Sequence, residues 1–207
     1  MNSRMTIPDI PLPPVPWLTG LRFAEALRTA ALIFAGKAKK GGQIPYISHL
    51  LGTCAIALEN GATEDEAIAA LLHDTIEDIT PADQARAAVE RFGPDVLRIV
   101  EGCSDSWTHP KPPWKERKES YIRHMEEADR SVLLVSAADK LHNARAIVCD
   151  LRQHGDEVWK RFNATREQEL WYYRELLKVF ERRLTDRPAL LSELELAISE
   201  MERLANP

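Results

Sequence analysis

Cysteine is scarce in this sequence, and the few cysteines show no pairing pattern. The three cysteines, Cys54, Cys103 and Cys149, are odd in number, lie far apart and form no C-x-x-C pair. This pattern argues against a disulfide framework and against a cysteine-based zinc site. It is typical of a reduced protein, and we therefore expect a cytoplasmic location.

Long apolar runs are also lacking. No stretch supplies the about 20 consecutive apolar residues that a membrane-spanning helix requires. The longest uncharged run, residues 41–58, is interrupted by polar residues and by Pro45. The N-terminal segment has no apolar centre of the kind that a signal peptide needs, because prolines break it up. We expect a soluble protein without a membrane partner.

A strong excess of either charge is absent as well. Lys and Arg together number 27 and Asp and Glu together number 32, which gives a formal net charge of −5. So small an acidic excess argues against a nucleic-acid partner that is held through overall charge. A local basic pocket for a phosphorylated small molecule remains compatible with this composition.

What the sequence does contain is apolar residues at helical spacing. Of its 207 residues, 44% are apolar, which is enough for the core of one domain. Residues 1–17 carry prolines that deny the backbone its helical donors, so we expect an extended arm there. Residues 18–207 show helix after helix and no convincing strand pattern. The prediction is an all-α fold with a single helical domain.

Capping and stop signals delimit the expected helices. Thr63 and Glu66 form a capping-box pattern, while Thr80-Pro81 and Gly93 begin and end a further helix. A helix that begins at Thr19 is expected to continue as far as residue 41. The expected helices are residues 19–41, 48–61, 63–72, 80–93, 96–100, 114–128, 131–151, 165–183 and 188–205.

Four polar clusters lie next to apolar sequence, where a purely structural chain does not need them. They are His49, His73-Asp74, Glu77-Asp78 and Asp139, the last followed by Lys140 and Asn143. Burying a carboxylate costs several kcal/mol unless a partner or a metal ion compensates for it. Asp74 and Asp139 both follow apolar runs directly, so each needs such a partner.

Two imidazoles and two carboxylates form a mixed nitrogen and oxygen donor set. Such a set suits Mn²⁺, Fe²⁺, Co²⁺ or Zn²⁺ better than Ca²⁺ or Mg²⁺. On helical geometry Glu77 lies one turn beyond His73, and Asp78 lies one turn beyond Asp74. These carboxylates could orient or deprotonate a water molecule at the metal. The structural alternatives are a core histidine and a solvated helix end, and the coincidence of four clusters favours the metal site over them.

Three stretches carry a family resemblance. They are IPYISH at residues 44–49, AALLHDTIED at residues 69–78 and ADKLHNAR at residues 138–145. The order of His49, His73-Asp74 and Asp139 resembles the H…HD…D signature of the HD-domain metal phosphohydrolases. Within that superfamily, the stretches resemble the hydrolase domain of Rel/SpoT-type alarmone enzymes and the free-standing small alarmone hydrolases. The likeness covers residues 21–180, and we expect a hydrolase that acts without a synthetase domain.

The resemblance implies a metal-dependent hydrolase of small nucleotides. It implies that one Mn²⁺ is held by His49, His73, Asp74 and Asp139, and that Glu77 and Asp78 handle the attacking water. The implied reaction removes the 3′-pyrophosphate from a nucleotide alarmone, (p)ppGpp or (p)ppApp. The resemblance leaves the oligomeric state open, with a homodimer as one alternative.

Four further residues are expected to bind the substrate: Lys40, Lys140, Asn143 and Tyr172. Asn143 follows Asp139 by one turn and suits the ribose or a phosphate, although it could also be a packing amide. Lys40 belongs either to a loop that meets the substrate or to a basic helix end. Tyr172 lies in an aromatic cluster of a kind that more often belongs to the core.

Base recognition and reaction type have alternatives. Lys40 begins a Lys-Gly-Gly-Gln run where the long Rel enzymes usually have Arg-Lys-Ser-Gly, whose arginine packs on the guanine. Lysine cannot reproduce that planar stack, so the adenosine alarmone is an alternative substrate. Two other possibilities are a phosphohydrolase of another nucleotide, such as a 5′-nucleotidase or a dinucleotide phosphatase, and a catalytically silent nucleotide-binding module. The intact Glu77-Asp78 pair speaks against the silent module.

Overall fold

Helices make up the regular structure throughout the part of the chain that the computed structural model describes, residues 19–40, 42–106 and 111–205. The all-α prediction is therefore confirmed, while the expected arm at residues 1–17 lies outside the described residues. The elements are α1 (Leu21–Ile33), α2 (Ile47–Glu59), α3 (Glu64–Leu72), α4 (Thr75–Asp78), α5 (Ala82–Glu90), α6 (Pro94–Cys103), α7 (Trp114–Glu127), α8 (Arg130–His154), the 3-10 helix η1 (Gly155–Arg161), α9 (Arg166–Arg183) and α10 (Pro188–Ala205).

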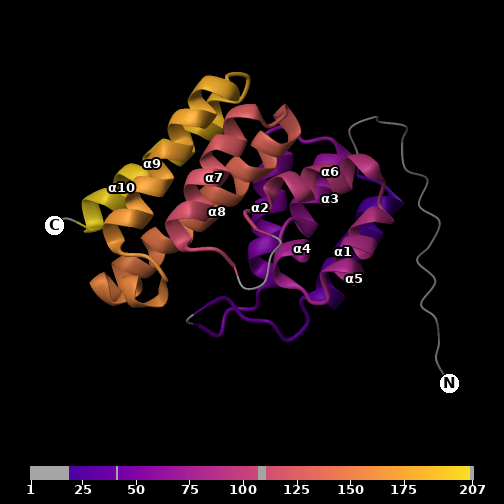
Figure 1. Ribbon diagram of the computed structural model, residues 1–207, viewed down its shortest axis with the longest axis horizontal. Helices are drawn as coiled ribbons and strands as arrows, with labels where there is room; N and C mark the ends of the chain where they lie inside the picture. Colours follow the sequence, from indigo (N-terminus) through magenta and orange to yellow (C-terminus); the bar gives the residue numbers. More distant parts are fainter. Residues whose placement is uncertain (1–18, 41, 107–110, 206–207) are drawn as a thin grey trace.

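The long helix α8 connects two groups of helices. Figure 1 shows α1 to α6, in indigo to magenta, on one side and α9 and α10, in orange and yellow, on the other. Helix α8 contacts α2, α3 and α6 in the first group and α9 and α10 in the second. No described helix has the length and apolar composition needed to cross a lipid bilayer.

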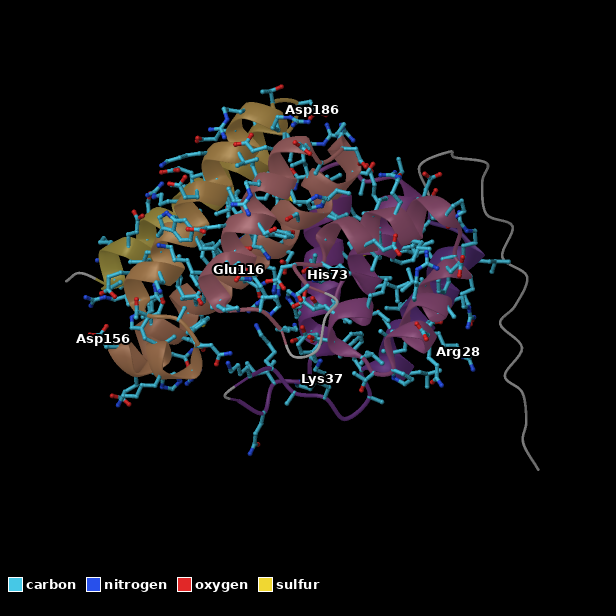
Figure 2. The ribbon with its side chains drawn as sticks, in the orientation of Figure 1. Arg28, Lys37, His73, Glu116, Asp156 and Asp186 are labelled. Carbon is cyan, nitrogen blue, oxygen red and sulfur yellow. The ribbon has the colours of Figure 1, made fainter. Side chains whose placement is uncertain are left out.

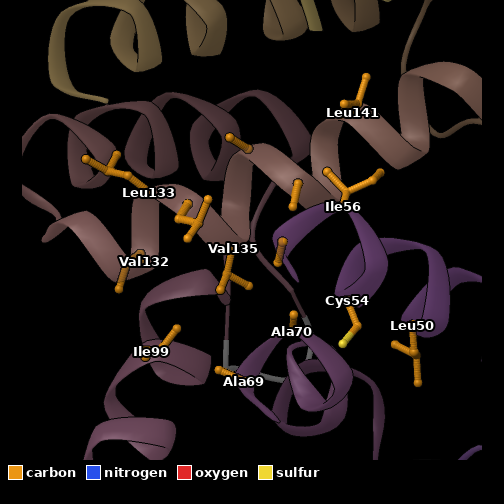
Figure 3. Packing of buried hydrophobic residues seen from close by; sticks show 14 of the residues in the cluster. Leu50, Cys54, Ile56, Ala69, Ala70, Ile99, Val132, Leu133, Val135 and Leu141 are labelled. Atoms are coloured by element: carbon orange, nitrogen blue, oxygen red, sulfur yellow. The ribbon is translucent and has the colours of Figure 1, made fainter. Parts of the chain in front are cut away.

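The interior position of α8 follows from its sequence. Asp129 caps its first turn, since the carboxylate accepts hydrogen bonds from the backbone N–H groups of Ser131 and Val132 at 2.9 and 3.2 Å. The following apolar run is buried on nearly all faces. Figure 3 shows side chains of α8 (Val132, Leu133, Val135, Leu141) packed with those of α2 (Leu50, Cys54, Ile56), α3 (Ala69, Ala70) and α6 (Ile99).

Helix α3 is short, alanine-rich and buried. The capping box at its start is confirmed: Glu66 N–H donates to Thr63 Oγ1 at 3.3 Å, and Thr63 N–H donates to Glu66 Oε2 at 2.7 Å. Its alanines let the backbone pack close to α2 and α8. The helix ends at Leu72, so His73 and Asp74 leave it in the interior of the molecule.

The prediction that the first helix reaches residue 41 is wrong, because α1 ends at Ile33 and its N-cap is Gly20 rather than Thr19. Gly36 adopts a φ of 75° and turns the chain out of the helix. Residues 38 and 45 then pair as an isolated bridge. Tyr46 closes this loop, since its ring stacks on that of Phe34 with 5.1 Å between centroids.

Other boundaries differ by smaller amounts. The expected continuous turn from Asp74 to Asp78 is a separate short helix, α4, that follows a break at residues 73–74. Helix α6 is longer than the expected 96–100, and helix α8 extends three residues beyond 151. The 3-10 helix η1 was not predicted.

Candidate metal centre

Four side chains from three parts of the chain meet between α2, the α3–α4 junction and α8. His49 Nε2 and His73 Nε2 lie 3.2 Å apart. Asp74 Oδ2 lies 3.3 Å from each of these nitrogens. Asp139 Oδ1 lies 3.2 Å from His49 Nε2 and 3.5 Å from His73 Nε2. We call His49, His73, Asp74 and Asp139 the four-residue cluster.

The spacing of these donor atoms fits a single cation. Protein ligands bind zinc-like divalent ions at about 2.0–2.2 Å, which places neighbouring donors about 3–3.6 Å apart. Three of the four residues are buried, since His49 and His73 are each 4% exposed and Asp139 is 7% exposed, while the Asp74 side chain is 20% exposed. The donor atoms of His49, His73 and Asp74 all lie within 4.8 Å of one another, and Asp139 Oδ1 lies beside both imidazoles. This mixed set of nitrogen and oxygen donors suits a divalent metal ion.

The electrostatics of the cluster also favour positive charge at its centre. Burial alone would lower the pKa of His73, but Asp74 and Asp139 raise it to about 9. Burial would likewise raise the pKa of Asp139, yet Lys140 and the two histidines hold it well below its usual range. The charges of His73 and His49 likewise lower the pKa of Asp74 against the effect of burial. The two carboxylates therefore stay ionised and attract a cation into the cluster.

Hydrogen bonds fix the cluster carboxylates. Tyr46 Oη donates to Asp74 Oδ2 at 2.6 Å. Asp139 accepts from Lys140 Nζ at 2.5 Å and from Asn143 Nδ2 at 2.6 Å. Residues that surround a metal site in this way orient its ligands. Lys140 and Asn143 thus contact the cluster itself, besides facing the cavity described below.

Each imidazole also has a partner on its outer nitrogen. His73 Nδ1 lies 2.9 Å from the carbonyl oxygen of Ala70. His49 Nδ1 lies 2.9 Å from Nδ1 of His142. Burial, followed by His49 and Lys39, lowers the pKa of His142 to about 4. His142 was not predicted as a site residue, although it lies one helical turn after Asp139 and within a stretch that carries the resemblance.

The two acidic residues of α4 point to different surroundings. Glu77 lines the cavity beside the cluster and accepts hydrogen bonds from Lys111 Nζ at 2.6 Å and from the Asp105 N–H at 3.3 Å. Burial and the Asp105 charge raise the pKa of Glu77. Asp78 is not among the residues that line this cavity and instead forms an ion pair with Lys37 at 2.6 Å. Figure 2 shows Lys37 on the loop below His73.

The cavity has a volume of about 470 Å³ and is lined by the cluster together with basic, acidic and aromatic side chains. Its carboxylates outside the cluster are Glu77, Asp105, Asp150 and Glu169. The basic residues that line it are Lys39, Lys40, Lys111, Arg117, Lys118, Lys140 and Arg161. Its aromatic residues include Trp114, Phe162, Tyr172 and Tyr173. A cluster of cations around a partly apolar pocket is suited to a phosphorylated small molecule.

All four residues expected to bind substrate line this cavity. Lys40 lies in a loop rather than at a helix end, and its Nζ donates to Asn163 Oδ1 at 3.2 Å across the cavity mouth. Tyr172 is only 3% exposed and belongs to the core, but its hydroxyl has no hydrogen-bond partner among the described residues. Lys118 Nζ lies 4.6 Å from the centre of the Tyr172 ring.

Comparison with known proteins gives relatives of two descriptions. A GTP pyrophosphokinase of Brucella ovis is 35% identical over 131 residues, which cover 59% of this chain and 17% of that protein. A guanosine-3′,5′-bis(diphosphate) 3′-pyrophosphohydrolase of Xenopus tropicalis is 39% identical over 117 residues, which cover 56% of this chain and 60% of that protein. The protein of the same description from Danio rerio is 37% identical over 127 residues, which cover 60% of this chain and 64% of that protein. The match therefore spans less than two thirds of the length of these relatives.

A solved structure resembles the whole described fold. That structure is of a metazoan ortholog of SpoT, described as hydrolyzing ppGpp and playing a role in starvation responses. It matches this chain with a TM-score of 0.66 and 27% sequence identity. The likeness covers 91% of this chain and 98% of that one. The family model of the HD domain matches residues 26–169, a range that contains the complete four-residue cluster. This match extends over more than half of the sequence, and the chain therefore belongs to the HD domain family.

Proposed function

We propose that this chain is a hydrolase that removes the 3′-pyrophosphate from a nucleotide alarmone, (p)ppGpp or (p)ppApp, with one Mn²⁺ held by the four-residue cluster. The observation that carries this proposal is that one carboxylate oxygen of Asp74 and one of Asp139 each lie 3.2–3.5 Å from the two neighbouring imidazole nitrogens of His49 and His73, beside a cavity with several basic residues in its lining. Relatives described as 3′-pyrophosphohydrolases of guanosine bis(diphosphate) support the substrate class.

The chemistry divides between the metal ion and the acidic residues of α4. A divalent cation supplies Lewis acidity, which acidifies water and offsets charge on phosphoryl oxygens. Glu77 takes the proton of the attacking water, and its raised pKa brings it closer to neutral pH, where a general base is effective. Water adds to the phosphorus on ribose O3′, the O3′–P bond breaks, and pyrophosphate leaves while O3′ receives a proton. Asp78 assists Glu77, with its carboxylate oriented by Lys37.

Substrate binding is assigned to the cavity walls. Lys40 and Lys140 bind phosphate oxygens, and Asn143 binds the ribose or a phosphate. Tyr172 offers a buried hydroxyl without a partner among the described residues, and such a group favours a ligand that can hydrogen-bond to it. The cytoplasmic location and the alternative of a homodimer remain predictions.

The test replaces the two acidic residues and measures the release of pyrophosphate. With Mn²⁺ present, Glu77→Gln should lower turnover of ppGpp or ppApp by about 10²–10⁴-fold, the usual contribution of a general base. Asp78→Asn should lower it less. Binding of the nucleotide should persist in both variants, and the exposed Glu59→Gln on α2 serves as the matched control.

Two results would contradict the proposal. Unchanged turnover in the Glu77→Gln and Asp78→Asn double variant would disprove the assigned roles. Phosphate release from other nucleotides, with no pyrophosphate release from either alarmone, would favour the alternative of a different nucleotide phosphohydrolase. Binding of an alarmone with no turnover would favour the silent module.

A further inference from the structure

The two histidines of the cluster both point Nε2 at the cluster, but a backbone carbonyl holds one ring and a side chain holds the other. Each presents Nε2 to the cluster and Nδ1 to a group outside it. His73 Nδ1 lies 2.9 Å from the Ala70 carbonyl oxygen. A carbonyl oxygen only accepts hydrogen bonds, so His73 Nδ1 must carry the proton. Its Nε2 then presents a lone pair to a cation.

For His49 the outer partner is a side chain. The Nδ1 atoms of His49 and His142 are 2.9 Å apart, and two ring nitrogens at this distance need one donor and one acceptor. A cation at the cluster requires the Nε2 lone pair of His49, so His49 Nδ1 has to be the donor. His142 Nδ1 has to be the acceptor.

We propose that His142 is a positioning residue of the metal centre, because its Nδ1 accepts the hydrogen bond from His49 Nδ1–H and so keeps His49 Nε2 directed at Asp74 and Asp139. This inference rests on the metal site of the proposed function. It differs from that function in assigning a task to a residue that touches neither the cation nor the substrate. His142 is also the one of the two outer partners that a substitution can remove.

The packing of α2 against α8 provides the space for His142. Gly52 lies on α2, three residues after His49, just as His142 lies three residues after Asp139 on α8. A Cβ atom at position 52 would lie 2.1 Å from His142 Cδ2 and 2.3 Å from its Nε2. Any side chain at position 52 would therefore displace the ring. Helix α2 thus contributes the ligand His49 and the space at Gly52, and α8 contributes the ligand Asp139 and the His142 ring.

A pair of substitutions separates the hydrogen bond from simple packing. His142→Leu fills similar space without an acceptor, whereas His142→Asn places Oδ1 about where the imidazole has Nδ1. Calorimetric titration of the full chain with Mn²⁺ should show affinity reduced about 10–100-fold by His142→Leu, the usual effect of removing a residue that supports a metal ligand. His142→Asn should retain most of the affinity.

Gly52→Ala provides an independent route to the same defect. It should weaken Mn²⁺ binding about as much as His142→Leu, since it displaces the ring. In a His142→Ala background, where the ring is already gone, it should cause no further loss of affinity. An equal loss in both backgrounds would mean that Gly52 acts through α2 alone and would overturn this part of the inference.

NMR spectroscopy can follow the exchange of the His49 Nδ1 proton with water, and this exchange reports on the hydrogen bond rather than on packing. In the Zn²⁺-loaded chain, the His49 Nδ1 proton should be protected from exchange in the wild type and in His142→Asn, and should exchange rapidly in His142→Leu. The His73 Nδ1 proton, held by Ala70, should be unaffected.

The possible failures are distinguishable. If the wild-type chain does not bind Mn²⁺, the proposed metal centre and this inference both fall. If the wild type binds Mn²⁺ and His142→Leu binds it equally well, only the role of His142 is wrong. If His142→Asn is as weak as His142→Leu, the ring acts by packing and the hydrogen-bond assignment is overturned.

Discussion

At the scale of single residues, Asp105 connects the basic wall of the cavity to Glu77. Its carboxylate is 7% exposed and pairs with Arg117 at 2.5 Å and Lys118 at 2.7 Å. Its backbone N–H donates to Glu77 Oε2 at 3.3 Å. Asp105 therefore neutralises two partly buried cations and also contacts the proposed general base.

Replacing Asp105 should destabilise the protein. Asp105→Asn leaves the partly buried Arg117 and Lys118 without their carboxylate. Because both cations keep some contact with water, the cost should be below the roughly 3 kcal/mol or more of a fully buried pair, at about 1–3 kcal/mol. Urea unfolding at pH 7 should show this loss in the free energy of unfolding. The exposed Asp156→Asn is the control, for which we expect little change.

The loss of stability caused by Asp105→Asn should become smaller as the pH falls. Burial would raise the pKa of Asp105, but Lys118 and Arg117 hold it at about 2, below the value of about 3.9 in an unfolded chain. The stabilisation is complete above the unfolded pKa and is lost as the pH falls toward the folded pKa. The difference in stability between wild type and Asp105→Asn should shrink by about 1 kcal/mol between pH 5 and pH 3. A difference that does not vary with pH would contradict this account.

Some site residues could be predicted from the sequence, and others could not. The four-residue cluster could be proposed because its members adjoin apolar sequence and because Asp74 and Asp139 follow apolar runs, where an uncompensated carboxylate is costly. Asp78 was expected to face the metal site together with Glu77, and it does follow Asp74 by one helical turn, but its carboxylate pairs with Lys37 from the loop after α1. That long-range contact is not visible in the sequence. His142 could not be found, because its partner His49 lies on another helix and their contact depends on how α2 packs on α8.

At the scale of elements, local signals predicted most helices, and their failures have non-local causes. The capping box of α3 is confirmed, since it depends on residues three positions apart. A second capping box, between Thr165 and Gln168, begins α9 and was not predicted. The end of α1 was missed because it depends on pairing between residues 38 and 45 and on the stacking of Phe34 and Tyr46. That pairing puts Lys39 and Lys40 in a loop at the cavity.

The close contact between α6 and α8 at Gly102 leaves no room for a larger side chain, which can be tested by substitution. A Cβ atom on Gly102 of α6 would lie 2.5 and 2.9 Å from the two γ-methyl carbons of Val132. Gly102→Ala should therefore destabilise the protein by about 1–3 kcal/mol, the usual cost of overpacking. If packing did not matter, Gly102→Ala would instead stabilise the protein by about 1 kcal/mol, because alanine has the better helix propensity.

A double-mutant cycle with Val132→Ala checks this explanation. Removing both γ-methyl groups opens the space that the new Cβ needs, so Gly102→Ala should cost little or nothing in that background. Urea unfolding of the four proteins measures the coupling. Additive effects would mean that the two residues do not compete for space.

At the scale of the whole molecule, the all-α architecture followed from composition and periodicity, but the cavity did not. The cavity is formed by residues from the loop after α1, the α3–α4 junction, α7, α8 and α9, which lie far apart in the sequence. No local pattern specifies how these segments face one another. The resemblance to a known family supplied what periodicity could not, namely that the separated polar clusters belong to one site.

The central claim is that one cation joins α2, the α3–α4 junction and α8 through four side chains. Anomalous diffraction from crystals of the chain grown with Mn²⁺ tests it most directly. We predict a single strong peak within coordination distance of His49 Nε2, His73 Nε2, Asp74 Oδ2 and Asp139 Oδ1. A peak at any other place, or no peak while these four side chains remain well ordered, would contradict the account.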